Sequence, residues 1–120
     1  MPNLRLIHDN AADRATSLAA STTSGALVAA NLQNDFKGQV HRSTGTSVSY
    51  TLTWTAGETV GGVALPATNL SASATIRVRL YSDTGGTTLI ADSGAVNACP
   101  GLNLGLWNWA LPLNGNAFAF

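Results

Sequence analysis

Four side chains capable of acid–base or electrostatic chemistry lie close together in NLQNDFKGQVHRSTG, residues 31–45. They are Asp35, Lys37, His41 and Arg42, which fall within eight positions. A carboxylate that orients a histidine beside a serine or threonine hydroxyl is the arrangement of a hydrolase triad. Asp35 could orient His41, and a serine or threonine a few positions further along would be the nucleophile. The segment therefore raises the question of an active site.

A polar loop is the better interpretation of this segment. The sequence contains no Gly-x-Ser-x-Gly nucleophile elbow, and hydroxyl residues are so common here that some lie near any histidine. Asn and Asp side chains bond to their own backbone in turns, so Asn34-Asp35 predicts a turn, with His41 and Arg42 at a strand edge. We expect no enzyme activity. Asp35, His41 and Arg42 are then candidate contacts to a neighbouring subunit or a glycan.

Metal binding has little support in the sequence. Calcium takes six to eight oxygen ligands, of which Asp35 would supply one, and no Asp-x-Asp-x-Asp cluster is present. His8, His41 and Cys99 lie far apart and lack the spacing of a zinc site. We therefore predict no metal and no cofactor.

The composition describes one domain with few charges. Charged residues make up 10% of the 120 residues, against about 25% in an ordinary soluble domain, and the net charge is zero. This balance gives no electrostatic argument for nucleic acid or an anionic membrane surface. It also produces little repulsion between copies, which suits a protein that assembles. The single cysteine excludes an intrachain disulfide.

No targeting segment is evident in the sequence. The first residues, MPNLRLIHDNAADRA, lack the basic and apolar regions of a Sec signal peptide, and no window approaches 18 apolar residues. We expect synthesis in a reducing cytoplasm and no membrane insertion.

Alternation with period two predicts strands. Val48, Tyr50, Leu52 and Trp54 alternate with serines and threonines over 47–55, which predicts a half-buried strand whose Tyr50 and Trp54 lie in the core. TVGGVALP, 59–66, predicts a second strand, and ATIRVRLYSD, 74–83, a third. The turn signal DTGG makes residues 74–92 a predicted hairpin.

The two ends of the chain are less regular. LRLI, 4–7, is a short strand candidate. A weak helix capped by Asp9 or Asn10 is possible after it, but the Ser/Thr-rich run that follows favours extended or irregular chain. GLWNWALPL, 105–113, predicts a last strand. The terminal NAFAF implies that the chain continues or that a neighbouring subunit covers this edge. Short strands without a convincing helix predict an all-β, jelly-roll-like antiparallel sandwich.

Two pairs of side chains are further candidates for interfaces. Trp107 and Trp109 share one strand face, where they are either core or, if exposed, a platform for a sugar or a partner protein. Arg77 and Arg79 lie on the outer face of their strand, as a solvated face or as contacts to carboxylates of a neighbouring subunit.

The order of elements resembles the discoidin-type, galactose-binding-like jelly roll. The counterparts are Asn31-Leu32 before Asp35, then VGGVAL at 60–65 and VRLYSDTGGT at 78–87. His41 stands where that family usually has a tryptophan. The resemblance implies a jelly roll over about residues 27–92 and, as an alternative function, a carbohydrate-binding module for host surface glycans.

Most of the chain also resembles virion structural proteins of long-tailed bacteriophages, encoded among tail and baseplate genes. HDNAADRA, ANLQNDFKGQVHRSTGTS, TWTAGETVGGVALPATNLSASATIRVRLYSD and GLNLGLWNW carry this resemblance. It implies a non-enzymatic part of the tail tip or baseplate, located in the virion and assembled in the host cytoplasm. The expected partners are other virion proteins and further copies in a three- or six-fold ring. We expect a single domain over 1–120, with an arm at 1–26 and the sandwich at 27–120.

Overall fold

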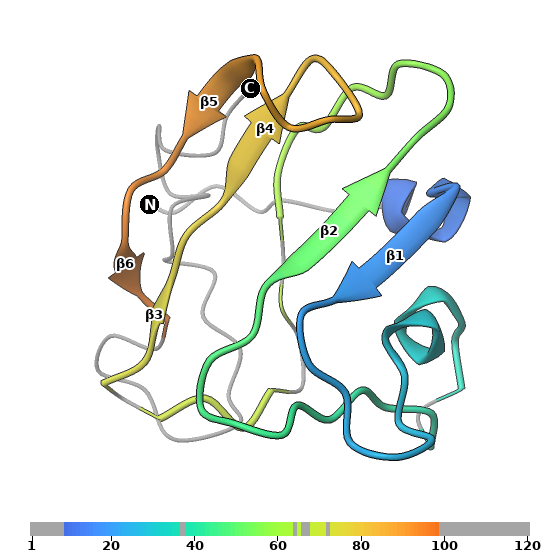
Figure 1. Cartoon of the computed structure of the whole chain (residues 1–120), viewed down its shortest axis with the longest axis vertical. Helices are drawn as coiled ribbons and strands as arrows, with labels where there is room; N and C mark the ends of the chain where they lie inside the picture. The colour runs from blue at the N-terminus through green and yellow to red at the C-terminus, as the bar shows by residue number, and fades with distance from the viewer. Residues whose placement is uncertain (1–8, 37, 64, 66–67, 72, 99–120) are drawn as a thin grey trace, which may run out of the picture. The chain divides into compact units, whose positions relative to one another are not determined.

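Short antiparallel strands dominate the part of the chain that the computed structural model describes, which is residues 9–36, 38–63, 65, 68–71 and 73–98. The elements are, in order, η1 (Ala11–Arg14), β1 (Ser17–Ala20), η2 (Ala29–Gln33), β2 (Tyr50–Thr53), β3 (Thr75–Ile76), β4 (Arg79–Tyr81), β5 (Leu89–Asp92) and β6 (Val96–Asn97). Both η elements are 3-10 helices, so no α-helix occurs in these ranges. The strands form three two-stranded sheets, β1–β2, β3–β6 and β4–β5 (Figure 1). The prediction of an all-β chain is confirmed for these residues.

The chain divides into two compact units. One is Leu4–Glu58, and the other is Thr59–Phe120 together with Met1–Asn3. None of the helices in the described ranges has the length and apolar character of a membrane span. The expected single sandwich, with an arm ending at residue 26, stays a prediction.

In the unit Leu4–Glu58, β1 and β2 pair from Ser17 opposite Thr53 to Ala20 opposite Tyr50. The extended interpretation of the Ser/Thr-rich run is thus confirmed at β1. The helix signal before it produces only one 3-10 turn, whose N-cap is Asn10. η2 packs against β1.

The predicted strand 47–55 forms over the shorter range of β2. Leu52 and Trp54 are half-buried, as the alternation predicts, but 40% of Tyr50 is exposed. The prediction that Tyr50 belongs to the core is therefore wrong. Its ring lies edge-on against the His41 ring, with 5.2 Å between the ring centroids.

In the second unit, β3 to β6 form one long interrupted hairpin. β4 pairs with β5, and β3 pairs with β6 through Thr75 opposite Asn97. The hairpin predicted at 74–92 is confirmed and extends to residue 97. Gly94 interrupts the pairing because its φ of 66° is left-handed, a conformation that glycine adopts without steric cost.

The strand predicted at 59–66 is wrong for the residues described there, 59–63 and 65, which adopt no regular structure. A strand needs a neighbour for its backbone N–H and C=O groups, and no pairing reaches this run in the described part of the chain. The strand candidates at 4–7 and 105–113 lie outside the described residues.

The described residues bury few apolar side chains. Their fully buried hydrophobic residues are two alanines, Ala29 and Ala98. Large apolar residues are exposed at nine described positions: Val28, Leu32, Phe36, Val40, Tyr50, Leu65, Tyr81, Leu89 and Ile90. Burial of apolar area is the main driving force for folding and association, so these residues are candidates for contact with other molecules.

Candidate functional site

A network of amide side chains organises the segment that the sequence singles out. The Asn34 side chain accepts a hydrogen bond from the Phe36 N–H (2.9 Å) and donates to the Asn31 carbonyl (2.9 Å) and to Gln39 Oε1 (2.5 Å). The Gln39 N–H donates to the Phe36 carbonyl, and Asn31 Nδ2 donates to the Val40 carbonyl. The turn predicted at Asn34 is therefore present. These bonds connect Asn31, Asn34 and Phe36 to Gln39 and Val40.

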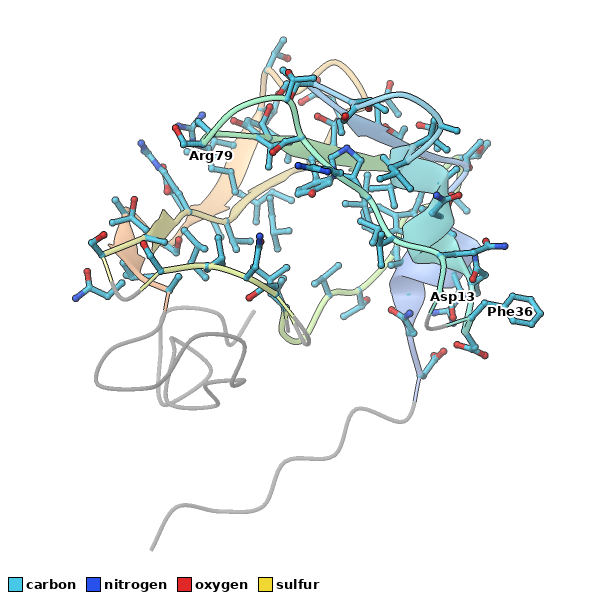
Figure 2. All side chains as sticks on the ribbon, turned by 90° about the horizontal axis from the view of Figure 1, so that it is seen from below. Asp13, Phe36 and Arg79 are labelled. Carbon is cyan, nitrogen blue, oxygen red and sulfur yellow. The ribbon has the colours of Figure 1, made fainter. Side chains whose placement is uncertain are left out.

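This loop presents an aromatic ring and a carboxylate to solvent. Phe36 is 72% exposed, the highest exposure among the large apolar residues described, and its ring extends away from the ribbon (Figure 2). The neighbouring Asp35 is also exposed and has no polar side-chain partner in the described part of the chain. The arrangement resembles an anchor residue of a protein interface more than a reaction centre.

Both ring nitrogens of His41 have a partner. Nε2 lies 3.0 Å from the Thr22 carbonyl, and Nδ1 lies 2.7 Å from the Tyr50 hydroxyl. Because a carbonyl only accepts, Nε2 carries a proton, and the second hydrogen bond joins Nδ1 to the Tyr50 hydroxyl. Burial raises the pKa of Tyr50, which keeps that hydroxyl protonated. His41 thus joins two loops to β2, and the pairing with Asp35 that a triad requires is not formed.

Arg42 continues the same connection through its backbone. Its N–H donates to the Leu27 carbonyl (3.1 Å), and its carbonyl accepts from the Ser24 N–H (2.8 Å). The residue is exposed. The backbone of Arg42 therefore positions a guanidinium group at the surface, where contact with a partner is sterically open.

Arg77 and Arg79 share one carboxylate of their own chain. Arg77 donates to both oxygens of Asp92, at 2.8 and 2.5 Å, whereas Arg79 Nε lies 3.7 Å from Asp92 Oδ2. The Arg77 bonds, followed by the Gly94 N–H, hold the pKa of Asp92 well below its usual range, and Asp92 raises the pKa of Arg77. The fork of Arg77 is thus engaged within the hairpin. Of the two arginines, Arg79 has more capacity for a carboxylate of another molecule.

Asp83 organises the hairpin turn. Its carboxylate accepts the backbone N–H of Thr87 (3.0 and 3.1 Å) and of Thr88 (2.6 Å), and the Thr87 hydroxyl (3.0 Å). The Gly86 N–H bonds to the Asp83 carbonyl, and Gly86 has a φ of 67°. The backbone bonds from Thr87 and Thr88 lower the pKa of Asp83 to about 2. These contacts are structural, as the DTGG turn signal implies.

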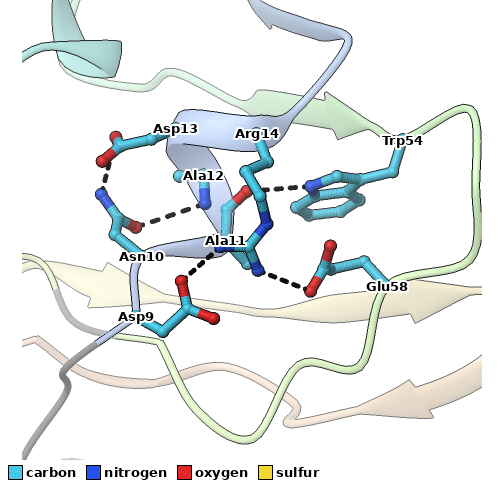
Figure 3. Close-up of polar contacts among 8 residues, drawn as sticks. All are labelled: Asp9, Asn10, Ala11, Ala12, Asp13, Arg14, Trp54 and Glu58. Carbon is cyan, nitrogen blue, oxygen red and sulfur yellow. Dashed lines mark hydrogen bonds and ion pairs between the residues drawn. The ribbon is translucent and has the colours of Figure 1, made fainter.

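Sequence reasoning missed a polar cluster around η1, which Figure 3 shows. Trp54 Nε1 donates to the Ala11 carbonyl (2.9 Å), and Arg14 forms ion pairs with Asp9 and, at 2.8 Å, with Glu58. The two carboxylates raise the pKa of Arg14, Asp9 more than Glu58. The one signal for this cluster in the sequence is the pair of opposite charges at Asp9 and Arg14, five residues apart. It attaches the 3-10 turn to the end of β2.

The remaining candidates are not assembled into a site here. Trp107 and Trp109 lie outside the described residues. Within the described ranges, no group of three His, Cys, Asp or Glu side chains is placed to hold a metal ion.

The comparisons with known proteins give no relative for this chain. No protein-family model matches the sequence, and no curated protein or solved structure matches it.

Proposed function

We propose that this chain is a non-enzymatic structural component of a bacteriophage virion, in the tail tip or baseplate, and that it acts by assembling with other virion proteins and with copies of itself. The resemblance of most of its sequence to such proteins supports the location. One observation supports assembly as the mechanism. Large apolar side chains are exposed, while the described residues bury few apolar side chains.

Open sheet edges add to this support. Each of the three sheets in the described part has only two strands, so each strand there leaves one edge without a partner from the described residues. Unpaired N–H and C=O groups along an edge are ready to pair with another chain. We further propose that the strands belong to a jelly-roll-like sandwich, which the antiparallel pairing and the order of elements support.

Localisation in the particle is the first test. We expect antibodies against the chain to label the tail end of intact virions, and peptides of the chain to occur in purified particles after nuclease and detergent washes. Host protein added to the lysate before purification controls for adsorption. The proposal fails if washed virions contain no more of the chain than of that added protein.

A carbohydrate-binding module is the second candidate, and the exposed ring of Tyr50 beside His41 favours it. Aromatic faces are common stacking surfaces for sugars. A glycan array would show selective binding that Tyr50→Ala abolishes and Tyr50→Phe retains. If neither the wild type nor the two variants bind any glycan on the array, assembly remains the only function proposed.

A further inference from the structure

The 3-10 helix η1 is held in place by polar side chains from distant parts of the sequence. Trp54 Nε1 donates to the Ala11 carbonyl (2.9 Å), as Figure 3 shows. Gln33 Nε2, at the end of η2, donates to the carbonyls of Ala12 (3.0 Å) and Ala15 (3.2 Å). None of the residues of η1 is buried. Attachment of η1 therefore depends on side-chain hydrogen bonds and ion pairs more than on apolar packing.

The segment that includes η1, residues 9–15 and here the η1 strap, ends where the β1–β2 sheet begins. The Thr16 N–H donates to the Thr53 carbonyl (2.7 Å). The Thr16 hydroxyl accepts from the Thr55 N–H (3.0 Å) and lies 2.8 Å from the Thr55 hydroxyl. These three bonds fix the first residue after the strap to the strand β2 and the residues that follow it. Thr16 can thus stay paired when the strap leaves.

The hydrogen bonds from Trp54 and Gln33 should hold the η1 strap more strongly than the ion pairs of Arg14 do. The Arg14 side chain, which pairs with Asp9 and Glu58, is 47% exposed. Ion pairs that are open to solvent contribute little because water and salt screen them. The bonds from Trp54 and Gln33 are partly buried, and a polar group that loses its partner away from water costs more than an exposed one.

We propose that the η1 strap is a conformational device that detaches as one unit, by opening between Ala15 and Thr16, while β1 and β2 stay paired. Segments with few buried apolar contacts open locally at a lower free energy than the sheet beside them. Opening frees the indole N–H of Trp54 and the amide of Gln33. It also lets residues 9–15 contact another molecule without unfolding of the sheet, and a molecule that binds the open strap shifts the population towards it. This inference goes beyond the proposed virion function and does not depend on it.

Native-state hydrogen exchange of the full chain, measured by NMR, tests the proposal. In the wild type, the amides of Asp13 and Ala15 and the indole N–H of Trp54 should have protection factors at least ~10-fold below those of the Thr16 and Ser21 amides. The first two amides bond within the strap, whereas the last two bond across the β1–β2 pair. Equal protection of all five groups would overturn the proposal, because the strap would then open only together with the sheet.

Variants of the three holding side chains test which contacts fasten the η1 strap. Gln33→Ala removes both of its bonds to strap carbonyls and should accelerate exchange at Ala15 about 10-fold. Trp54→Phe keeps an aromatic ring but removes the donor, so it should accelerate this exchange about 5-fold. Arg14→Gln should accelerate it by less than ~3-fold. Exchange at Ser21 should be unchanged in all three variants.

Gln39→Ala is the matched control, because it removes a glutamine that accepts a bond from Asn34 outside the strap. It should leave exchange at Ala15 unchanged. If Gln33→Ala accelerates exchange at Ser21 as much as at Ala15, the strap is not a separate unit and the proposal is refuted. An Arg14→Gln variant that opens the strap more than Gln33→Ala does would overturn the assignment of Gln33 as its main fastening.

Discussion

At Asn34, His41 and Asp83, a single polar side chain holds a loop or a turn through two or more hydrogen bonds. Charged residues and histidines are scarce in this sequence, and that scarcity makes the few that occur stand out as candidates for catalysis. Their geometry shows a different use, because each is directed towards backbone groups or a nearby side chain. At the residue scale, the polar groups described here define where loops lie.

His41 and Tyr50 offer the clearest test at this scale. Tyr50→Phe removes the hydroxyl that is hydrogen-bonded to His41 Nδ1 and keeps the ring, so we expect the free energy of unfolding to fall by about 1 kcal/mol. His41→Phe should cost about 1–2 kcal/mol, because it removes both hydrogen bonds of the imidazole. Urea denaturation of the two single variants and the double variant measures the coupling between the side chains.

A matched control is Asp35→Asn, which changes a side chain without a polar partner in the described ranges and should stay within about 0.5 kcal/mol of the wild type. Additive effects of His41→Phe and Tyr50→Phe would contradict the proposed bond. So would an Asp35→Asn variant that is destabilised as much as His41→Phe.

At the element scale, local patterns predicted what local chemistry determines. DTGG predicted the turn because Asp83 bonds to following N–H groups and Gly86 accepts a positive φ. Alternation predicted the half-buried Leu80 of β4 and Leu52 of β2, but not the exposure of Tyr50. The run at 59–66 has an equally good pattern but no partner strand among the described residues, and pairing over long sequence distances is invisible in a local pattern. For the same reason, the sequence predicted His41 as a candidate but not its bond to Tyr50.

The turn of the β4–β5 hairpin should depend on pH through Asp83. Backbone N–H groups lower its pKa from 3.8 to about 2, so the ionised form stabilises the folded state. This stabilisation is complete above pH 4 and is lost as the pH falls through 2, because the carboxyl group is then protonated in both states. Asp83→Asn should therefore lower the melting temperature by a few degrees at pH 7, and most of this difference should disappear near pH 2.

The measurement is a series of thermal melts of the wild type and Asp83→Asn between pH 2 and pH 7. Asp13→Asn is the control, since Asp13 bonds to the side chain of Asn10 and caps no hairpin N–H group. A difference between the wild type and Asp83→Asn that stays constant over this range would show that charge at Asp83 does not stabilise the turn.

At the scale of the whole molecule, stability and assembly are linked. The described residues bury little apolar surface and expose large apolar side chains on η2, at Phe36 and on β5. Composition indicated this in part, since a chain with few charges and no net charge has little to keep its copies apart. Which apolar residues are exposed depends on tertiary packing. The alternation in the sequence therefore predicted Tyr50 in the core, although it is exposed.

The melting temperature should consequently rise with protein concentration, because copies that bind the folded state, and not the unfolded one, stabilise it by mass action. Each tenfold increase above the dissociation constant adds up to about 1.4 kcal/mol, which corresponds to roughly 5 °C for a domain of this size. Scanning fluorimetry from about 1 to 100 μM would measure the slope, and Phe36→Ala should reduce it, because it removes the most exposed of the large apolar side chains described. A melting temperature independent of concentration for the wild type would mean that the folded chain is stable alone, and that its exposed apolar residues do not stabilise it by self-association.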